Sequence, residues 1–87
     1  MAVWVDDMRI SKNGQIWCHL VADNWQEMHD FCLQQLHLAR TRFHAKAKLP
    51  HYDLTWAERE RALQLGALPI NRRQLVAKSR FLKSTMD

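Results

Sequence analysis

Two stretches near the N-terminus have the residue composition of β-strands and are separated by a turn signal. Residues 2–6 are rich in β-branched and aromatic side chains, and residues 16–22 form a nearly continuous apolar run broken only by His19. The dipeptide Asn13-Gly14 between them is the strongest short-range signal for a two-residue hairpin turn. The pattern therefore predicts an N-terminal β-hairpin over residues 2–22.

Alternation of side chains along the two strands predicts two unlike sheet faces. The apolar face carries Val3, Val5, Cys18, Leu20 and Ala22. The mixed face carries Trp4, Asp6, Met8, Trp17, His19 and Val21. A two-residue turn pairs Lys12 with Gln15, Met8 with His19, and Asp6 with Val21. On that register the apolar face is the better core, and Asp6 lies one diagonal step from His19 on the mixed face.

Three later segments combine apolar helical spacing with capping residues. The first begins at a capping box over residues 24–27, or at the equally good box over 23–26, and extends to about residue 36 or 37. The second covers residues 55–66, where a Thr-x-x-Glu box marks the start and a glycine the end. The third begins at the Asn-x-x-Gln box of residues 71–74. These segments predict three helices.

The stretch between the first two helices is less regular. Residues 40–44 fit a short strand with Arg40, Arg42 and His44 on one side. Residues 45–50 fit an exposed connection, because the proline at its end disfavours helix in the residue before it.

The chain is long enough for one hydrophobic core and too short for two. Residues 68–70 add a short strand, which Pro69 limits to a sheet edge. We therefore predict a single small α/β domain over residues 1–87, with α+β as the alternative. It would consist of a sheet with the N-terminal hairpin, about three helices, and a tail that frays over residues 83–87.

Basic residues are concentrated in the second half of the chain. The net charge is +4, and of thirteen lysines and arginines only Arg9 and Lys12 precede residue 40. This surplus permits nucleic acid, a nucleotide or an acidic protein surface as partner. Acidic residues begin at Asp6, so the N-terminal segment does not have the pattern of a signal peptide. No apolar run approaches the ~20 residues of a membrane span. We therefore expect a cytoplasmic protein without a membrane partner, whose Cys18 and Cys32 are reduced core residues.

The first candidate for chemistry is His51-Tyr52-Asp53, just before the second predicted helix. In an extended segment His51 and Asp53 point to the same side and Tyr52 to the other. A carboxylate so placed can orient an imidazole as a base or help to bind a metal. The alternative is structural: Asp53 caps the helix and His51 is an ordinary loop residue.

His19 and Asp6 on the mixed face are the second candidate. A lone histidine in an apolar strand is often a buried, hydrogen-bonded core residue, and a carboxylate often ends a strand. Their closeness in the predicted register favours acid–base or metal chemistry instead. His29 lies one residue off the apolar stripe of the first helix and could reach the sheet or stay half exposed.

Arginines are the candidates for phosphate contacts, because the planar guanidinium matches phosphate oxygens. We single out Arg40, Arg42 and Arg61, with a solvated surface role as the alternative. Arg72 and Arg73 fall in a first helical turn, where the helix dipole disfavours cations, and this hints at a use for them. The chain has no Gly-rich phosphate loop and no CxxC, HExxH or GxSxG motif. A divalent metal is conceivable but not indicated by ligand spacing, so the cofactor is unknown.

Six short motifs together resemble a known family. They are V-x-V-D at residues 3–6, H-L-x-A-D at 19–23, E-x-H at 27–29, R-x-R-F at 40–43, H-Y-D at 51–53 and R-A-x-x-x-G-A at 61–67. In combination they resemble domain-of-unknown-function family 4031 of bacteria and their phages, as far as about residue 77. The resemblance implies a phage or prophage origin and no assigned activity, and at residue 44 it leads us to expect glutamine in place of His44. It also implies that seven residues belong together: His19, Asp23, His29, His51, Tyr52, Asp53 and Arg61.

Three functions fit these features. The first is a phage accessory protein that binds a host nucleic-acid-processing or defence complex through tryptophan and arginine anchors. The second is a small hydrolase or transferase that acts on a nucleotide or nucleic-acid phosphate. Its residues would be Asp6, His19, His51 and Asp53 for catalysis, Arg40, Arg42, Tyr52 and Arg61 for substrate binding, and Asp23 and His29 in support. The third is a basic nucleic-acid-binding module built on the last helix. A shared cleft containing Asp6, His51 and Asp53 would favour the enzyme.

Overall fold

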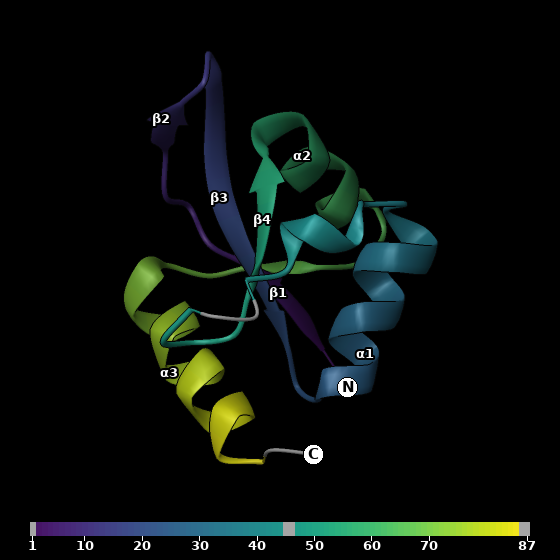
Figure 1. The fold of residues 1–87 in the computed structure, drawn as a ribbon, viewed down its shortest axis with the longest axis vertical. Coiled ribbons are helices and arrows are strands. Elements are labelled where there is room, and N and C mark those ends of the chain that lie inside the picture. Colours follow the sequence, from purple (N-terminus) through teal and green to yellow (C-terminus); the bar gives the residue numbers. More distant parts are fainter. Residues whose placement is uncertain (1, 45–46, 86–87) are drawn as a thin grey trace.

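The computed structural model describes residues 2–44 and 47–85 of the chain (Figure 1). Its five strands are β1 (Val3–Val5), β2 (Ile10–Lys12), β3 (Gln15–Ala22), β4 (Tyr52–Thr55) and β5 (Leu68–Pro69). Its three α-helices are α1 (Trp25–Asp30), α2 (Trp56–Gln64) and α3 (Arg72–Ser84). A π-helix, η1 (Phe31–Gln35), continues α1, and a 3-10 helix, η2 (Arg40–Arg42), follows it. The predicted α/β class is confirmed.

The strand β3 is the centre of the sheet. Leu20 in β3 pairs with Val5 of β1 on one side and with Tyr52 of β4 on the other, both antiparallel. Nearer the turn, Trp17 pairs in the same way with β2 and β4. β1 and β2 therefore lie end to end along one edge of β3, and β4 lies along the other. β5 pairs with β1 in parallel and forms the outer edge, as predicted from Pro69.

The predicted turn is correct, but the predicted register of the whole hairpin is wrong. Lys12 pairs with Gln15 across Asn13 and Gly14, whose positive φ angles of 53° and 74° suit this turn. Between β1 and β2 the chain leaves the ladder and takes up two extra residues. As a result Val5, rather than residue 7, pairs with Leu20. Met8 therefore does not face His19, and Asp6 does not face Val21.

The same offset places Asp6 beside His19. The backbone N–H of Asp6 donates to the carbonyl of His19 at 3.1 Å, so the two residues lie directly opposite each other rather than on a diagonal. Because side chains alternate with a period of two, a two-residue offset leaves every residue on its predicted face.

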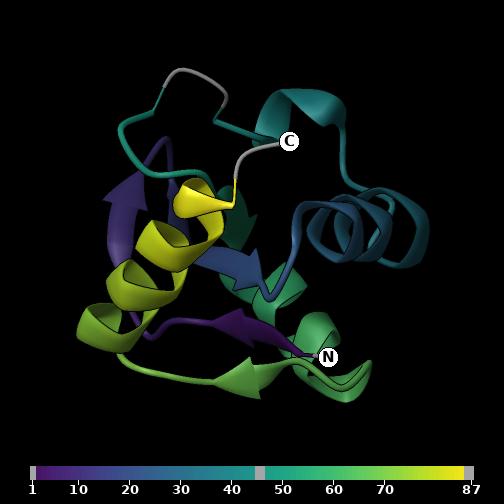
Figure 2. The ribbon, with the colours of Figure 1, turned by 90° about the horizontal axis from the view of Figure 1, so that it is seen from below.

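The two faces of the sheet are covered unequally. The apolar face packs against α1, η1 and α2 through buried residues such as Leu20, Met28, Cys32 and Ala62. Figures 1 and 2 show α3 on the opposite side of the sheet from α1. There α3 packs Leu75 against Trp4 and Val21, at one end of the mixed face. The other end of that face, which carries His19, stays open to a cleft.

The helix starts and the ends of the first two helices were predicted to within about two residues, but the π-helical turn and the loop after it were not. Asn24 caps α1, and reciprocal capping boxes begin α2 at Thr55 and α3 at Asn71. The first helix ends in the π-helical turn η1, followed by His37 at a φ of 57°. The strand predicted over residues 40–44 is wrong: three of these residues form η2, and only Phe43 makes a bridge, to Tyr52.

Several smaller expectations can also be compared with the structure. Cys18 and Cys32 are free and buried, as expected. Of the predicted exposed connection, residues 45–46 lie outside the described residues, and Pro50 is buried. The tail expected to fray from residue 83 is helical to Ser84, and residues 86–87 lie outside the described residues. Within the part of the chain that the structure describes, no helix is both long and apolar enough to cross a bilayer.

Candidate functional site

A row of three polar side chains crosses the sheet on its mixed face. Asp6 follows β1, His19 lies opposite it in β3, and Asp53 pairs with His19 from β4. Asp6 is completely buried and accepts two hydrogen bonds from His19, one from the backbone N–H (2.9 Å) and one from ring Nδ1 (2.8 Å). On the far side of the ring, His19 Nε2 lies 3.9 Å from Asp53 Oδ1. Arg59 of α2 donates to the Asp6 carbonyl at 2.8 Å and fixes the end of the row.

His51 completes the cluster from the segment that leads into β4. The carbonyl of Leu49 accepts a hydrogen bond from His51 Nδ1 at 2.9 Å, and His51 Nε2 lies 3.3 Å from Asp53 Oδ1. The rings of His19 and His51 meet edge to face with their centroids 4.9 Å apart. Two residues apart in an extended segment, His51 and Asp53 point to the same side, as their spacing predicted.

His44 is a third imidazole on the same carboxylate. Its Nε2 lies 2.5 Å from Asp53 Oδ2, and its ring stacks on His51 at a centroid distance of 4.9 Å. It is more exposed than the other members of the cluster. The sequence placed it beside two arginines on a strand that does not exist, so its partnership with Asp53 was not predicted.

The charges in the cluster shift the pKa values of two members. Burial raises the pKa of Asp53, but the His51 hydrogen bond and the neighbouring imidazoles outweigh it and hold the pKa below its ordinary value. Burial lowers the pKa of His51, but its hydrogen bonds to Asp53 and the Leu49 carbonyl outweigh burial and raise the pKa. The cluster therefore favours a carboxylate at Asp53 with positive charge next to it.

Hollows open on both sides of the cluster. One, of about 160 Å³, lies toward α3 and is lined by Asp6, His19, Leu49, His51, Arg72, Leu75, Val76 and Ser79. The other, of about 360 Å³, lies toward the β2–β3 hairpin and is lined by Ile10, Lys12, Asn13, Trp17, His19, Thr41, Arg42, His44, His51 and Asp53. The side chains of His19, His51 and Asp53 are 22%, 19% and 21% exposed, so they reach solvent from half-buried positions.

The predicted catalytic residues Asp6, His19, His51 and Asp53 are thus brought together. Of the predicted supporting and substrate-binding residues, Arg42 lines a hollow beside them and the others lie elsewhere. His29 and Tyr52 meet on the apolar face, where His29 Nδ1 and the Tyr52 hydroxyl lie 2.7 Å apart. Asp23 accepts a hydrogen bond from the Ala2 N–H at 2.6 Å and holds the start of β1. The set of seven residues that the resemblance grouped is therefore divided between the two faces of the sheet and its edge.

The predicted phosphate-binding arginines lie apart from the hollow toward α3. Arg42 makes a two-pronged ion pair with Glu58, at 2.5 and 3.1 Å. Arg40 and Arg61 are exposed on η2 and α2. Arg42 lines the hollow toward the hairpin and Arg72 the hollow toward α3, each together with His19 and His51. The position of Arg72 in a first helical turn was the sequence signal for it.

The hydrogen bonds around the two histidines decide which ring atoms remain free. A carbonyl and a carboxylate only accept, so Nδ1 of each ring carries the proton in the neutral form. The unprotonated Nε2 atoms of His19 and His51 then face the Asp53 carboxylate, and the three ligand atoms lie within 4.8 Å of one another. A cation satisfies this arrangement: a proton on Nε2 of His51, which the raised pKa of His51 favours, or a metal ion in its place. A metal ion there would have His19, His51 and Asp53 as ligands, and Asp6 and the Leu49 carbonyl would orient the two rings.

Comparison with known proteins places the chain in a family. No curated protein and no solved structure matches it. A family model matches residues 3–82, nearly the whole chain and all residues of the cluster, which confirms the resemblance seen in the sequence motifs. The chain belongs to the family described as Protein of unknown function (DUF4031).

Proposed function

We propose that this domain is a hydrolase of phosphate esters that uses one divalent transition metal held by His19, His51 and Asp53. The observation that carries the proposal is the convergence of the Nε2 atoms of two rings and a carboxylate oxygen within 4.8 Å, with each ring hydrogen-bonded at Nδ1. Two imidazoles and one carboxylate form a ligand set used in catalytic zinc sites, which keep a further position for water. Imidazole ligands also suit iron and nickel.

Phosphate is the substrate group that fits the surroundings of the site best. Arg72 lines the hollow over His19 and His51, where a guanidinium can contact two oxygens of a phosphate. Within the described residues no carboxylate forms an ion pair with Arg72, so its charge is available to a ligand. Arg42, by contrast, is neutralised by Glu58.

The chemistry follows from the groups present. A bound metal ion supplies a water of lowered pKa and polarises the phosphoryl oxygen. Asp6 and the Leu49 carbonyl hold the two imidazoles in the tautomer that binds metal, and Arg72 orients the phosphate. His44, outside the ligand set, donates Nε2–H to Asp53, so its Nδ1 would receive the proton of the attacking water and return it to the leaving oxygen. Water thus adds across one P–O ester bond, with hydroxide going to phosphorus and the proton to the leaving group.

Metal binding by the purified protein is the first test. We expect calorimetry to show one equivalent of Zn²⁺ or Mn²⁺ bound by the wild type and none by His51→Ala, with circular dichroism unchanged. Co²⁺ should give the absorption bands of a low-coordinate site, a readout independent of activity. Hydrolysis of p-nitrophenyl phosphate esters and of a labelled oligonucleotide should follow the bound metal.

The matched control is His37→Asn. His37 is exposed and has a positive φ, which asparagine tolerates, so this variant removes a histidine without touching the cluster. It should bind metal like the wild type. Equal loss of metal binding in both variants, or no binding by the wild type, would overturn the proposal.

A second candidate function is binding to a protein, such as a host nucleic-acid-processing or defence complex encountered by a phage protein. It is favoured by three large apolar side chains that remain at the surface, Phe81 (62% exposed), Leu68 (50% exposed) and Leu65 (42% exposed). Capture of one defined host complex that is lost in Phe81→Ser but kept in His51→Ala would support this function. Capture that is unaffected by Phe81→Ser would argue against it.

A further inference from the structure

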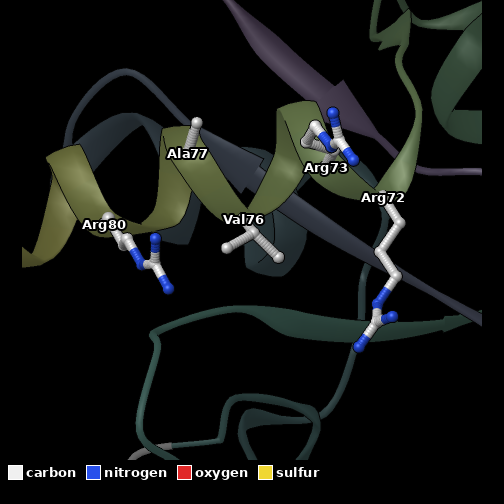
Figure 3. Close-up of a pocket in the computed structure, with 5 residues that line it drawn as sticks. All are labelled: Arg72, Arg73, Val76, Ala77 and Arg80. Carbon is white, nitrogen blue, oxygen red and sulfur yellow. The ribbon is translucent and has the colours of Figure 1, made fainter.

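A basic hollow lies on the outer face of α3, next to the candidate metal site. It has a volume of about 490 Å³ and is lined by Arg72, Arg73, Val76, Ala77 and Arg80. Figure 3 shows Arg72, Val76 and Arg80 projecting toward the same side of the helix, with the three guanidinium groups spread along the helix. The spacing of these residues, four apart, explains why they share a row.

Among the described residues, the lining of this hollow carries three arginines and no acidic residue. No aspartate or glutamate occurs between residues 61 and 86, while α3 carries Arg72, Arg73, Lys78, Arg80 and Lys83. Within the described residues, the three arginines of the hollow make no ion pair with a carboxylate. Arg72 and Arg73 also lie in the first turn, at the positive end of the helix dipole, where cations are unfavourable unless an anion binds.

The basic hollow is continuous with the site. Arg72 and Val76 line both the basic hollow and the smaller hollow over His19 and His51. On the far side of these histidines, the third hollow contains Lys12 and the half-buried ring of Trp17. The candidate metal ligands therefore lie between a row of arginines on one side and a lysine with an aromatic ring on the other.

The three hollows together form a path across the candidate metal site, which we call the nucleic-acid path. We propose that single-stranded nucleic acid binds along this path, with its backbone on Arg72, Arg73 and Arg80. Arg72 and Arg80 are eight positions apart, about 12 Å along a helix. That length contains about three intervals of the ~3.4 Å axial spacing of one strand, hence about four phosphates, and exceeds what a mononucleotide offers. Trp17 supplies a ring on which a base can stack. A flexible single strand can enter the half-buried cluster, whereas a stiff duplex cannot bend into it.

This inference deepens the proposed function and names its substrate class, but its test does not depend on catalysis. Binding of a fluorescein-labelled twelve-nucleotide oligothymidylate is measured by anisotropy in EDTA at several salt concentrations, beside a labelled duplex of equal length. The triple variant R72Q/R73Q/R80Q is compared with R9Q/R40Q/R61Q, which removes the same charge at exposed positions outside α3 and outside the three hollows.

We expect the α3 variant to bind the single strand at least about tenfold more weakly and the control variant within about threefold of wild type. The slope of log affinity against log salt should fall by about 2 in the α3 variant, because each phosphate contact contributes ~0.7. Circular dichroism and thermal melting check that both variants fold. Equal weakening by both variants, equal affinity for the duplex, or no binding by the wild type would overturn the inference.

The outcomes separate this inference from the proposed function. If His51→Ala loses metal but keeps strand binding in EDTA, both stand. Strand binding by a protein that takes up no metal would leave the nucleic-acid path in place and remove the hydrolase. Metal uptake and hydrolysis of p-nitrophenyl phosphate esters without strand binding would keep the hydrolase and overturn the nucleic-acid path.

Discussion

The tripeptide His51-Tyr52-Asp53 contributes to two histidine environments on opposite faces of one sheet. On the apolar face, Tyr52 meets His29 in a single hydrogen-bonded pair, surrounded by the rings of Trp25 and Phe43. Burial and the neighbouring Cys32 raise the pKa of the Tyr52 hydroxyl to about 12, so this hydroxyl keeps its proton at neutral pH. The two polar atoms of the pair satisfy each other, as is usual for a core.

On the mixed face, His51 and Asp53 join a cluster that has more polar groups than packing requires. Ring nitrogens not held by Asp6 or Leu49 converge on one carboxylate and reach a hollow. The comparison teaches that a histidine near a polar partner does not by itself indicate function. What distinguishes the mixed face is that two rings, each held at Nδ1, turn their second nitrogen toward the same carboxylate.

The largest expected effect is that of replacing Asp53, the carboxylate that His19 and His51 both face. Asp53→Asn removes the negative charge and should lower the affinity for Zn²⁺ by more than about 100-fold, because carboxylates bind hard cations far better than amides do. Calorimetric titration of the metal-free protein measures this. An affinity within threefold of wild type would mean that the two faces do not differ in the way we describe.

Asp6→Asn should have the next largest effect, although Asp6 is not a ligand. Loss of a carboxylate behind a metal-binding histidine commonly lowers metal affinity 10- to 100-fold. The amide can still accept the backbone N–H of His19, so the fold should be retained. Metal titration is combined with thermal melting, and unchanged metal affinity in a folded variant would contradict the orienting role of Asp6.

Tyr52→Phe tests the apolar face. It leaves His29 Nδ1 without its partner and should reduce the free energy of unfolding by about 1–3 kcal/mol. Urea denaturation gives the value. Metal affinity should stay within about twofold of wild type, and a tenfold change would show that the two faces are coupled.

The smallest expected effect concerns pH and a carboxylate outside both environments. Burial raises the pKa of Glu58, but hydrogen bonds from Arg42 and the Thr55 backbone outweigh it, so the pKa is lower in the folded state. Its contribution is therefore present above the unfolded pKa and is lost as pH falls through the folded pKa. Glu58→Gln should flatten the loss of stability in acid by less than about 1 kcal/mol, measured by thermal melts from pH 7 to pH 3. An unchanged slope would contradict this.

Local patterns explain what could be predicted from the sequence. Capping boxes at Thr55 and Asn71 and the turn at Asn13-Gly14 depend on residues a few positions apart, and all three are present. The strand β4 was not predicted, because its four residues are defined by pairing with β3, more than thirty positions away. The register beyond the turn failed for a related reason: sequence alternation gives the face of a residue but not its partner.

The site was predictable to the same degree. The alternation in His51-Tyr52-Asp53 indicated which side chains share a side. That Asp6, His19 and Asp53 form one row depended on strand order and on the two-residue offset, neither of which has a local signal. His44 and the Leu49 carbonyl reach the cluster from the loop between η2 and β4. No residue type in this loop predicts its path.

The row Asp6–His19–Asp53 also has a thermodynamic consequence. It ties the N-terminal hairpin to β4 across a loop of more than thirty residues, so an ion bound there acts as a reversible cross-link that exists only in the folded chain. Linkage then requires the ion to raise the free energy of unfolding, by about 2.7 kcal/mol at a free concentration 100 times the Kd. For a domain of 87 residues this is a substantial fraction of the total. The melting temperature of this small protein should therefore report the metal supply around it.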